Sequence, residues 1–129
     1  MRVTKIFNFD SAHQLRRAEL SDGENEKLFG RCREVHGHSW TLHVTYEGEV
    51  DLVSGMVINF LDLKKIVEEK VIEVFDHHML NDFVELPTCE NLLLDIAARL
   101  RSKLSGLVEL RLYETPTSCA TWKSVDDSR

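Results

Sequence analysis

Histidines at three positions have the type and spacing of a metal site. His36 and His38 are two residues apart, so on a β-strand their side chains point to the same face. Gly37 between them leaves room for a third group, and His13, at the end of an earlier alternating segment, can supply it. Three neutral imidazoles with an open fourth position form a catalytic zinc site, because structural zinc fills all four positions and favours cysteine. An isolated His-x-His pair is also compatible with ordinary surface or core histidines.

Cys32 precedes His36 by four residues and could lie beside a bound metal without ligating it. A nearby cation favours the thiolate form of a cysteine, which can act as a base or a nucleophile. A single cysteine is more often a small buried apolar group, and we interpret Cys89 and Cys119 in that way. Three cysteines without a Cys-x-x-Cys pair do not indicate a disulfide framework or a four-cysteine zinc site.

Asp76, His77 and His78 are predicted to end a helix, where the negative helix terminus favours an imidazolium. A carboxylate that holds an imidazole is the usual orienting device for acid–base chemistry. The same residues are compatible with a solvated helix end. Spacing alone does not decide whether His77 or His78 faces a site.

Glu114 continues the strand parity of the apolar residues Leu110 and Leu112. A carboxylate on a buried face is costly unless it is paired. A planar heterocycle with two adjacent N–H donors, such as a pterin or a guanine, would pair with both carboxylate oxygens. Glu114 is therefore a candidate anchor for a base edge, and the alternative is a strand end that emerges into solvent.

Four strands are expected to position these groups. Alternation of side chains predicts strands at residues 3–13, 36–47, 107–114 and 120–123. His43 lies on the 36–47 strand but has the opposite parity to His36 and His38, so we exclude it from the site.

Two helices are expected between the strand pairs. Apolar spacing of three and four predicts a helix over 61–75 with Asn59 as N-cap, and a second helix with Thr88 as N-cap and Gly106 as its stop. The polar segment 16–30 is predicted to be a long loop. This order predicts an α+β domain in which two helices cover one face of a four-stranded antiparallel sheet.

The composition limits the possible partners. The chain has 129 residues, enough for one compact domain and too few for two, so residues 1–129 are taken as a single domain. A net charge of -6 repels polyanions, so we expect no nucleic-acid partner. Neither a membrane-length apolar run nor a signal-peptide pattern is visible, so we expect a cytoplasmic protein with no membrane partner.

Six segments occur in a recognisable order along nearly the whole chain: FDSAHQL, CREVHGH, GMVINFLDLKKIV, FDHHMLND, PTCENL and YETPT. In this order they resemble the family of 6-pyruvoyl-tetrahydropterin synthases and 6-carboxy-5,6,7,8-tetrahydropterin synthases. The resemblance implies the T-fold, assembled as trimers around a barrel and usually as a hexamer of two trimers, with active sites between subunits. It also implies a small-molecule pterin substrate, 7,8-dihydroneopterin triphosphate.

The resemblance implies a role for each motif residue. His13, His36 and His38 resemble the ligands of Zn²⁺. Cys32 resembles the thiol that moves protons at the substrate side chain, with Asp76 and His77 as its relay partners. Glu114 resembles the pterin anchor, and Thr88 is expected to bind substrate as well.

Two reactions are possible within this family. Loss of triphosphate with internal redox gives 6-pyruvoyl-tetrahydropterin, whereas loss of acetaldehyde and triphosphate gives 6-carboxy-5,6,7,8-tetrahydropterin, a precursor of queuosine. The three-residue gap between Cys32 and His36 resembles the carboxy branch, whereas the segment LSDGENEKLFG and the asparagine in MVINF resemble the pyruvoyl branch. The sequence-based hypothesis is the carboxy product, with the pyruvoyl product as alternative.

Other readings remain open. Glu34 resembles a glutamate that a related branch uses to cleave the side chain toward 6-hydroxymethyl-dihydropterin for folate, but it is also compatible with a solvated loop. A zinc- or pterin-binding relic without turnover, and a Cys-His hydrolase, are two further classes.

The triphosphate needs local positive charge, for which the candidates are Arg16, Arg17, Lys27, Arg31 and Arg33.

Overall fold

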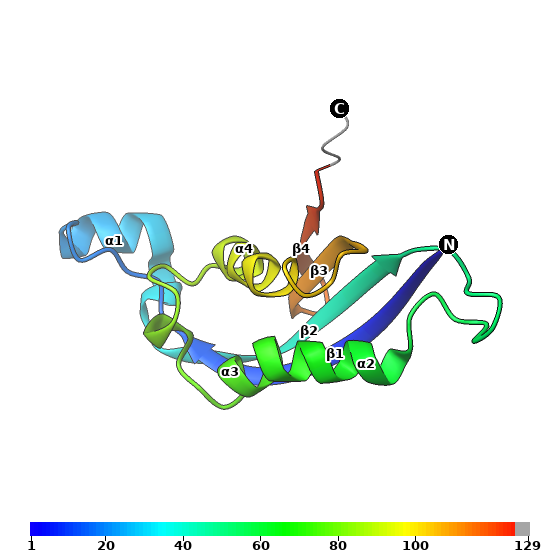
Figure 1. Cartoon of the computed structure of the whole chain (residues 1–129). Coiled ribbons are helices and arrows are strands. Elements are labelled where there is room, and N and C mark those ends of the chain that lie inside the picture. The colour runs from blue at the N-terminus through cyan, green and yellow to red at the C-terminus, as the bar shows by residue number, and fades with distance from the viewer. Residues whose placement is uncertain (126–129) are drawn as a thin grey trace.

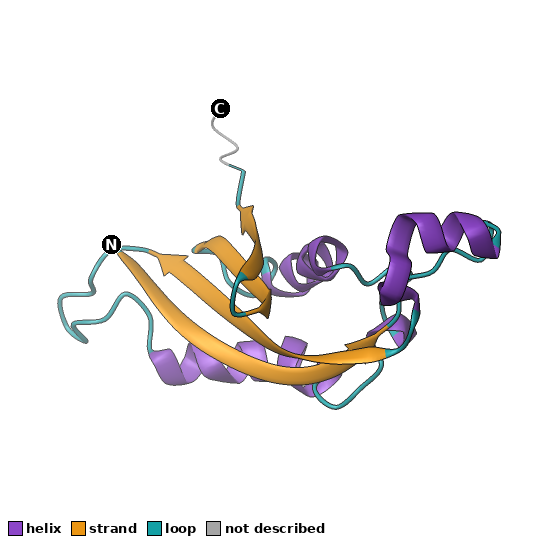
Figure 2. Cartoon of the chain, turned by 180° about the vertical axis from the view of Figure 1, so that it is seen from behind, coloured by secondary structure: helices purple, strands orange, loops and turns teal. Residues whose placement is uncertain are grey.

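The computed structural model describes residues 1–125, which form a four-stranded antiparallel sheet with helices on one face (Figure 1, Figure 2). The strands are β1 (Arg2–His13), β2 (His36–Glu47), β3 (Leu107–Thr115) and β4 (Ser118–Lys123). Their order in the sheet follows the chain, and every neighbouring pair is antiparallel. The predicted α+β architecture is therefore confirmed.

Two helical stretches cover the sheet. The first consists of α2 (Phe60–Val67), the π-helical turn η2 (Glu68–Ile72) and α3 (Glu73–Phe75). The second is α4 (Cys89–Leu100). Both pack on the face of the sheet whose side chains are predicted to be apolar, and Trp40 is fully buried beneath them. No helix among the described residues is long and apolar enough to cross a membrane.

The predicted loop over 16–30 is wrong, because it contains the helix α1 (Asp22–Phe29). Ser21 Oγ accepts from the Glu24 backbone N–H at 3.1 Å, and the Glu24 carboxylate accepts from the Ser21 N–H at 3.0 Å. This capping box starts the helix. Its single buried residue is Asn25, so the segment has no apolar periodicity that would reveal a helix.

The predicted helix stop at Gly106 is also wrong, since α4 ends at Leu100. Gly106 is needed for a different reason. A Cβ atom there would lie 2.5 Å from the Glu47 carbonyl oxygen and 2.6 Å from the Tyr46 ring. Both distances are too short for a Cβ atom, so a larger residue would clash. The glycine lets the start of β3 approach the end of β2.

The segment after α3 closes the outer edge of β1 near its end. His77 donates its backbone N–H to the Asp10 carbonyl at 2.6 Å, and Ala12 donates to the His78 carbonyl at 3.3 Å. The Asp10 N–H donates to Asp76 Oδ1 at 2.8 Å. The Asp-His-His segment is thereby fixed against the strand that ends at His13.

Candidate metal centre

The three predicted histidines converge at the ends of β1 and β2. His13 lies directly opposite His36 in the strand register, and His38 is two residues further along the same face. Their ring centroids are 4.5 Å apart for His13 and His36, 5.2 Å for His13 and His38, and 5.0 Å for His36 and His38. One nitrogen of each ring lies within 4.8 Å of the other two. The predicted convergence is confirmed.

Backbone carbonyls fix the orientation of two of the rings. His13 Nδ1 lies 2.7 Å from the Pro87 carbonyl oxygen, and His36 Nδ1 lies 2.7 Å from the Glu34 carbonyl oxygen. Because a carbonyl oxygen only accepts, each Nδ1 carries a proton, and in the neutral ring the lone pair is therefore on Nε2. A second contact of this kind is typical of metal-bound histidines.

The cluster has nitrogen atoms that a metal ion would satisfy. Nε2 of His13 and Nε2 of His38 are buried and have no hydrogen-bond partner among residues 1–125. Burial lowers the pKa of His13 and of His38, and for His38 the nearby Glu114 carboxylate opposes that effect. Buried neutral imidazoles with unpaired lone pairs fit a divalent ion with nitrogen ligands.

Glu114 lies between this cluster and a separate cavity. Its Oε1 is 3.3 Å from His38 Nε2, but the two atoms do not have hydrogen-bond geometry. The carboxylate also lines a cavity of about 360 Å³ together with Cys89, Glu90 and Cys119. A ligand anchored at Glu114 could therefore extend toward the histidines.

The two remaining cysteines differ in exposure. Cys89 is buried, and its Sγ donates to the Leu112 carbonyl at 3.3 Å. Burial raises the pKa of Cys89 to about 11, as expected of a structural cysteine. Cys119 is exposed, so the prediction that it is buried is wrong. It lies on β4, the edge strand of the sheet that residues 1–125 form, where one side of the strand has no neighbour.

Cys32 is half-buried on η1 (Gly30–Arg33), a 3₁₀ turn. The Leu15 N–H donates to the Cys32 carbonyl at 2.8 Å, which attaches this turn to the residues just after His13. Cys32 is not one of the residues of the histidine cluster, and its place beside a bound metal stays a prediction. Within the described chain its thiol forms no hydrogen bond with Asp76 or His77.

Asp76 and His77 form the predicted carboxylate–imidazole pair. Asp76 Oδ2 lies 3.0 Å from His77 Nδ1, while His78 Nδ1 contacts only the Asp76 backbone carbonyl. The Asp10 N–H lowers the pKa of Asp76, and His77 adds to this effect. His77 has φ of 59°, in the left-handed region that non-glycine residues rarely adopt. The structure thus selects His77 as the partner of the carboxylate.

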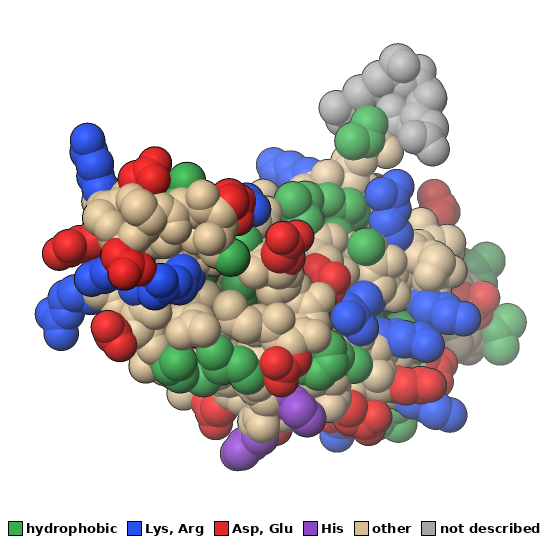
Figure 3. Space-filling view, turned by 90° about the vertical axis from the view of Figure 1, so that its left-hand side faces the viewer, with side chains coloured by type: hydrophobic (Ala, Val, Ile, Leu, Met, Phe, Trp, Pro, Cys, Tyr) green, Lys and Arg blue, Asp and Glu red, His purple; other side chains and the backbone are tan. Residues whose placement is uncertain are grey.

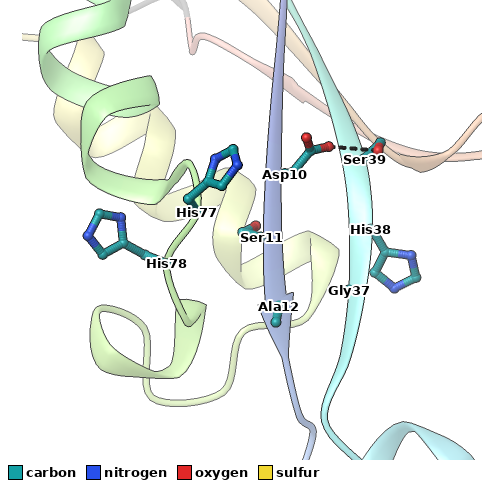
Figure 4. A pocket seen from close by; sticks show the side chains of 8 residues that line it. All are labelled: Asp10, Ser11, Ala12, Gly37, His38, Ser39, His77 and His78. Atoms are coloured by element: carbon teal, nitrogen blue, oxygen red, sulfur yellow. Dashed lines mark hydrogen bonds between the residues drawn. The ribbon is translucent and has the colours of Figure 1, made fainter.

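Asp76 and His77 are not part of the histidine cluster of the same chain. Figure 4 shows His77 and His78 on one side of β1 and His38 beyond β2. His77 and His38 line the same depression of about 500 Å³, together with Ala12 and Gly37, two small residues opposite each other in the sheet. The His77 imidazole is largely exposed. Within one chain, therefore, the relay pair does not contact the candidate metal ligands.

Two other predictions concern residues near the site. The Thr88 hydroxyl accepts from the Asn91 N–H at 3.1 Å, which confirms it as the N-cap of α4, whereas its contact with substrate stays a prediction. His43 lies on the opposite face of β2, with its ring 5.1 Å from that of Tyr113. Its exclusion from the cluster is confirmed.

The basic residues expected to meet the triphosphate lie among acidic ones. Arg16 forms an ion pair with Asp22 at 2.5 Å, and Arg17 lies 3.5 Å from a carboxylate oxygen of Glu19. Figure 3 shows Lys and Arg side chains interspersed with Asp and Glu on this end of the molecule. Arg16 and Arg17 are thus already paired, which makes them poorer candidates for a phosphate site.

The sequence did not indicate Pro87 as a partner of the cluster. Its carbonyl reaches His13 from 74 residues away, and a backbone acceptor has no signature in residue types. The only available signal is its position immediately before the predicted N-cap Thr88, where the chain must turn.

The sequence matches a known protein family over nearly its whole length. Residues 2–124 match the model described as 6-pyruvoyl tetrahydropterin synthase. The chain belongs to this family.

Known relatives of the 6-pyruvoyl tetrahydropterin synthase family align over most of the chain. The human 6-pyruvoyl tetrahydrobiopterin synthase is 36% identical over 131 residues, covering 95% of this chain and 90% of the human protein. A dihydroneopterin monophosphate aldolase of Pyrococcus furiosus is 38% identical over 110 residues, covering 85% of this chain and 83% of the relative. The solved 6-pyruvoyl tetrahydropterin synthase of Caenorhabditis elegans has a TM-score of 0.89 and 33% identity, covering 97% of this chain and 96% of that one. The resemblance inferred from the motifs is confirmed, and so is the T-fold.

Proposed function

We propose that this protein is a metal-dependent lyase that converts 7,8-dihydroneopterin triphosphate to 6-pyruvoyl-tetrahydropterin and triphosphate. The observation that carries the proposal is the triad of His13, His36 and His38 with Glu114 beside it. The triad suits the hydroxylated side chain of the substrate, and the carboxylate suits the two N–H groups of the pterin edge.

This product differs from the sequence-based hypothesis. The short gap between Cys32 and His36 favours the carboxy product. The family model and the human relative, which align over nearly the whole chain, carry the pyruvoyl name. Because the full-length similarity includes every motif and the gap is a single feature, we favour the pyruvoyl product.

The chain supplies the groups for each step. Glu114 accepts hydrogen bonds from N3–H and the 2-amino group and so orients the pterin ring. A divalent ion held by the three imidazoles would acidify the side-chain hydroxyls, and we propose that it is Zn²⁺. Cys32 removes and returns protons on the side-chain carbons, which enolises them. Elimination of triphosphate across C2′–C3′ gives an enol that tautomerises to a methyl ketone, so C2′ is oxidised as C3′ loses its oxygen. Enolisation through C1′ then moves two electrons into the N5–C6 bond of the ring, which gives the second ketone and the tetrahydropterin, so no external oxidant or reductant is needed.

The Asp76–His77 pair is proposed to serve as proton relay for Cys32. Since the pair forms no contact with the cluster among residues 1–125, we propose that it acts on the site of a neighbouring copy in a trimer or hexamer. Asp76 keeps the imidazole oriented through Nδ1, which leaves Nε2 free to exchange protons with the thiol.

A second candidate is side-chain cleavage to 6-hydroxymethyl-dihydropterin. It is favoured by the similarity to the archaeal aldolase and by the exposed carboxylate of Glu34. The Glu34 carbonyl already orients His36, so its side chain leaves the backbone at the edge of the cluster. In this reaction the carboxylate would take the proton of the C2′ hydroxyl as the C1′–C2′ bond breaks and releases a phosphorylated glycolaldehyde, and it would return that proton to C1′ to give the hydroxymethyl group.

The test is incubation of the protein with 7,8-dihydroneopterin triphosphate and identification of the pterin by mass spectrometry. We expect 6-pyruvoyl-tetrahydropterin with release of triphosphate. A 6-carboxy product with acetaldehyde, or 6-hydroxymethyl-dihydropterin, would replace the proposal by one of its alternatives. Pterin binding without turnover would indicate a non-catalytic relic, and turnover of amides or esters after complete chelation would indicate a hydrolase.

A further inference from the structure

Contacts from outside β1 hold His13 in the cluster. It is the most buried of the three histidines, with 1% of its surface exposed. Its ring is held by the Pro87 carbonyl, and the backbone of the next residue, Gln14, is held by Asn81. Both holding segments come from the connection between α3 and the first turn of α4.

Asn81 pairs with the backbone immediately after His13. It lies on the short 3₁₀ turn η3 (Leu80–Asp82). Its Oδ1 accepts from the Gln14 N–H at 3.0 Å, and its Nδ2 donates to the Gln14 carbonyl at 2.9 Å. The pairing of β1 with β2 ends at His13 and His36, so the amide replaces a strand neighbour for the residue next to a candidate ligand.

Asn91 fixes the carbonyl that holds the His13 ring. Its Nδ2 donates to the Leu86 carbonyl at 2.9 Å, and its backbone N–H donates to the Thr88 hydroxyl at 3.1 Å. These two contacts lie on either side of Pro87. They therefore set the direction of the Pro87 carbonyl, which determines that His13 presents Nε2 to the cluster.

We infer that Asn81 and Asn91 are positioning residues for the metal centre, and that they set its affinity for a divalent ion by acting through His13. Neither residue contacts the three rings directly, and each restrains a backbone group that His13 depends on. Contacts that fix the orientation and tautomer of a metal-bound histidine typically change metal affinity by about 10- to 100-fold. The inference rests on the proposed metal centre and does not depend on which pterin product is formed.

The test compares metal binding by three variants of the full chain. Each protein is stripped with a chelator and titrated with Co²⁺, whose ligand-field absorption reports affinity and coordination. Asn81→Ala removes both contacts with Gln14, and Asn91→Ala removes the contact with the Leu86 carbonyl while its backbone N–H can still donate to Thr88. Asn59→Ala is the matched control, because Asn59 accepts from the Leu61 N–H at 2.8 Å as the N-cap of α2, which begins near the opposite end of β1 (Figure 1).

All three substitutions are expected to lower the thermal stability of the apoprotein. Asn81→Ala and Asn91→Ala are expected to weaken Co²⁺ binding by about tenfold or more, and Asn59→Ala by less than about threefold. Asn81→Asp, which keeps the acceptor and loses the donor, is expected to fall between wild type and Asn81→Ala. It also serves as the reporter if the alanine variant does not fold.

Nitrogen-15 NMR of the apoprotein provides a readout that lost stability alone would not move. We expect the Nδ1–H tautomer for His13 in the wild type and a mixture of tautomers in Asn91→Ala. Wild-type Co²⁺ affinity in both the Asn81 and Asn91 variants, or an equal loss in Asn59→Ala, would overturn the inference. Absence of Co²⁺ binding by the wild type would overturn it together with the metal centre. If the variants rank in Co²⁺ affinity as expected but the wild type forms no pterin product, the proposed reaction would be refuted and the positioning roles would be supported.

Discussion

Glu114→Gln tests whether this carboxylate anchors the pterin or supports the metal centre. The substitution keeps the shape of the side chain and removes its charge. A carboxylate accepts from both N3–H and the 2-amino group of a pterin, whereas the glutamine amide keeps one acceptor and turns an NH₂ donor toward the second donor. The pterin would therefore lose one hydrogen bond and face one repulsive contact.

The expected size of the effect follows from the environment of the carboxylate. Hydrogen bonds to a charged group contribute about 1.5–3 kcal/mol each. The Glu114 side chain is 30% exposed, so solvent screens part of that energy. We therefore expect a loss of about 2–3 kcal/mol, which corresponds to a roughly 30- to 150-fold weaker pterin affinity.

Two measurements on the same variant separate the roles. Binding of 7,8-dihydroneopterin is followed by fluorescence, and bound metal is determined by atomic absorption. We expect weaker pterin binding with wild-type metal content. Glu109→Gln is the control, because Glu109 contacts Arg111 at 2.9 Å on the same strand and should not affect either measurement. Pterin affinity within threefold of wild type would refute the anchor, and loss of metal would show that Glu114 mainly serves His38, 3.3 Å away.

Three further predictions concern the thiols and the relay carboxylate. Cys32→Ala should bind pterin and metal within about twofold of wild type but lose product formation, since the thiol is needed only for proton transfer; retained turnover would contradict its role. At pH 8, iodoacetamide should label Cys119 well before Cys89, because a pKa of about 11 leaves only about 10⁻³ of the Cys89 thiol as thiolate; peptide mass spectrometry measures the order, and equal labelling would contradict it. The Asp10 N–H lowers the pKa of Asp76 below its usual value of 3.8, so its charge stabilises the fold above about pH 4 and that contribution is lost as the pH falls through the lowered pKa. Asp76→Asn should therefore reduce Tm near neutral pH and approach wild type in acid, and a difference in Tm that does not change with pH would show that the charge is not involved.

The sheet and the cluster were predictable because they depend on period-two patterns. The bounds of β2 coincide with the predicted 36–47, and the shared parity of His36 and His38 places them on one face. Pairing with β1 then brings His13 opposite His36, which follows from the antiparallel order of two strands of similar length. Residue type and alternation were sufficient for this part of the site.

Features that depend on polar contacts or local winding were not predictable from apolar spacing. Helix α1 buries only Asn25, so its signal was the capping box of Ser21 and Glu24. The π-helical turn η2 can be explained only once the structure is known. The buried residues of this helical stretch are four positions apart: Leu63, Val67, Val71 and Phe75. In an α-helix each such step drifts by about 40° around the axis, and a π-helical turn with more residues per turn compensates for part of that drift. The Pro87 carbonyl has no sequence signal because it is a backbone group.

Metal content of histidine variants tests the central claim most directly. The wild type and the variants His13→Ala, His36→Ala, His38→Ala and His43→Ala would be purified, loaded with Zn²⁺, dialysed and analysed by atomic absorption. His43 is the matched control because it lies on β2 but faces the opposite side of the sheet. The account predicts one tightly bound ion per chain in the wild type and in His43→Ala, and none in the other three. Wild-type metal content in all three cluster variants, or loss of metal in His43→Ala alone, would contradict it.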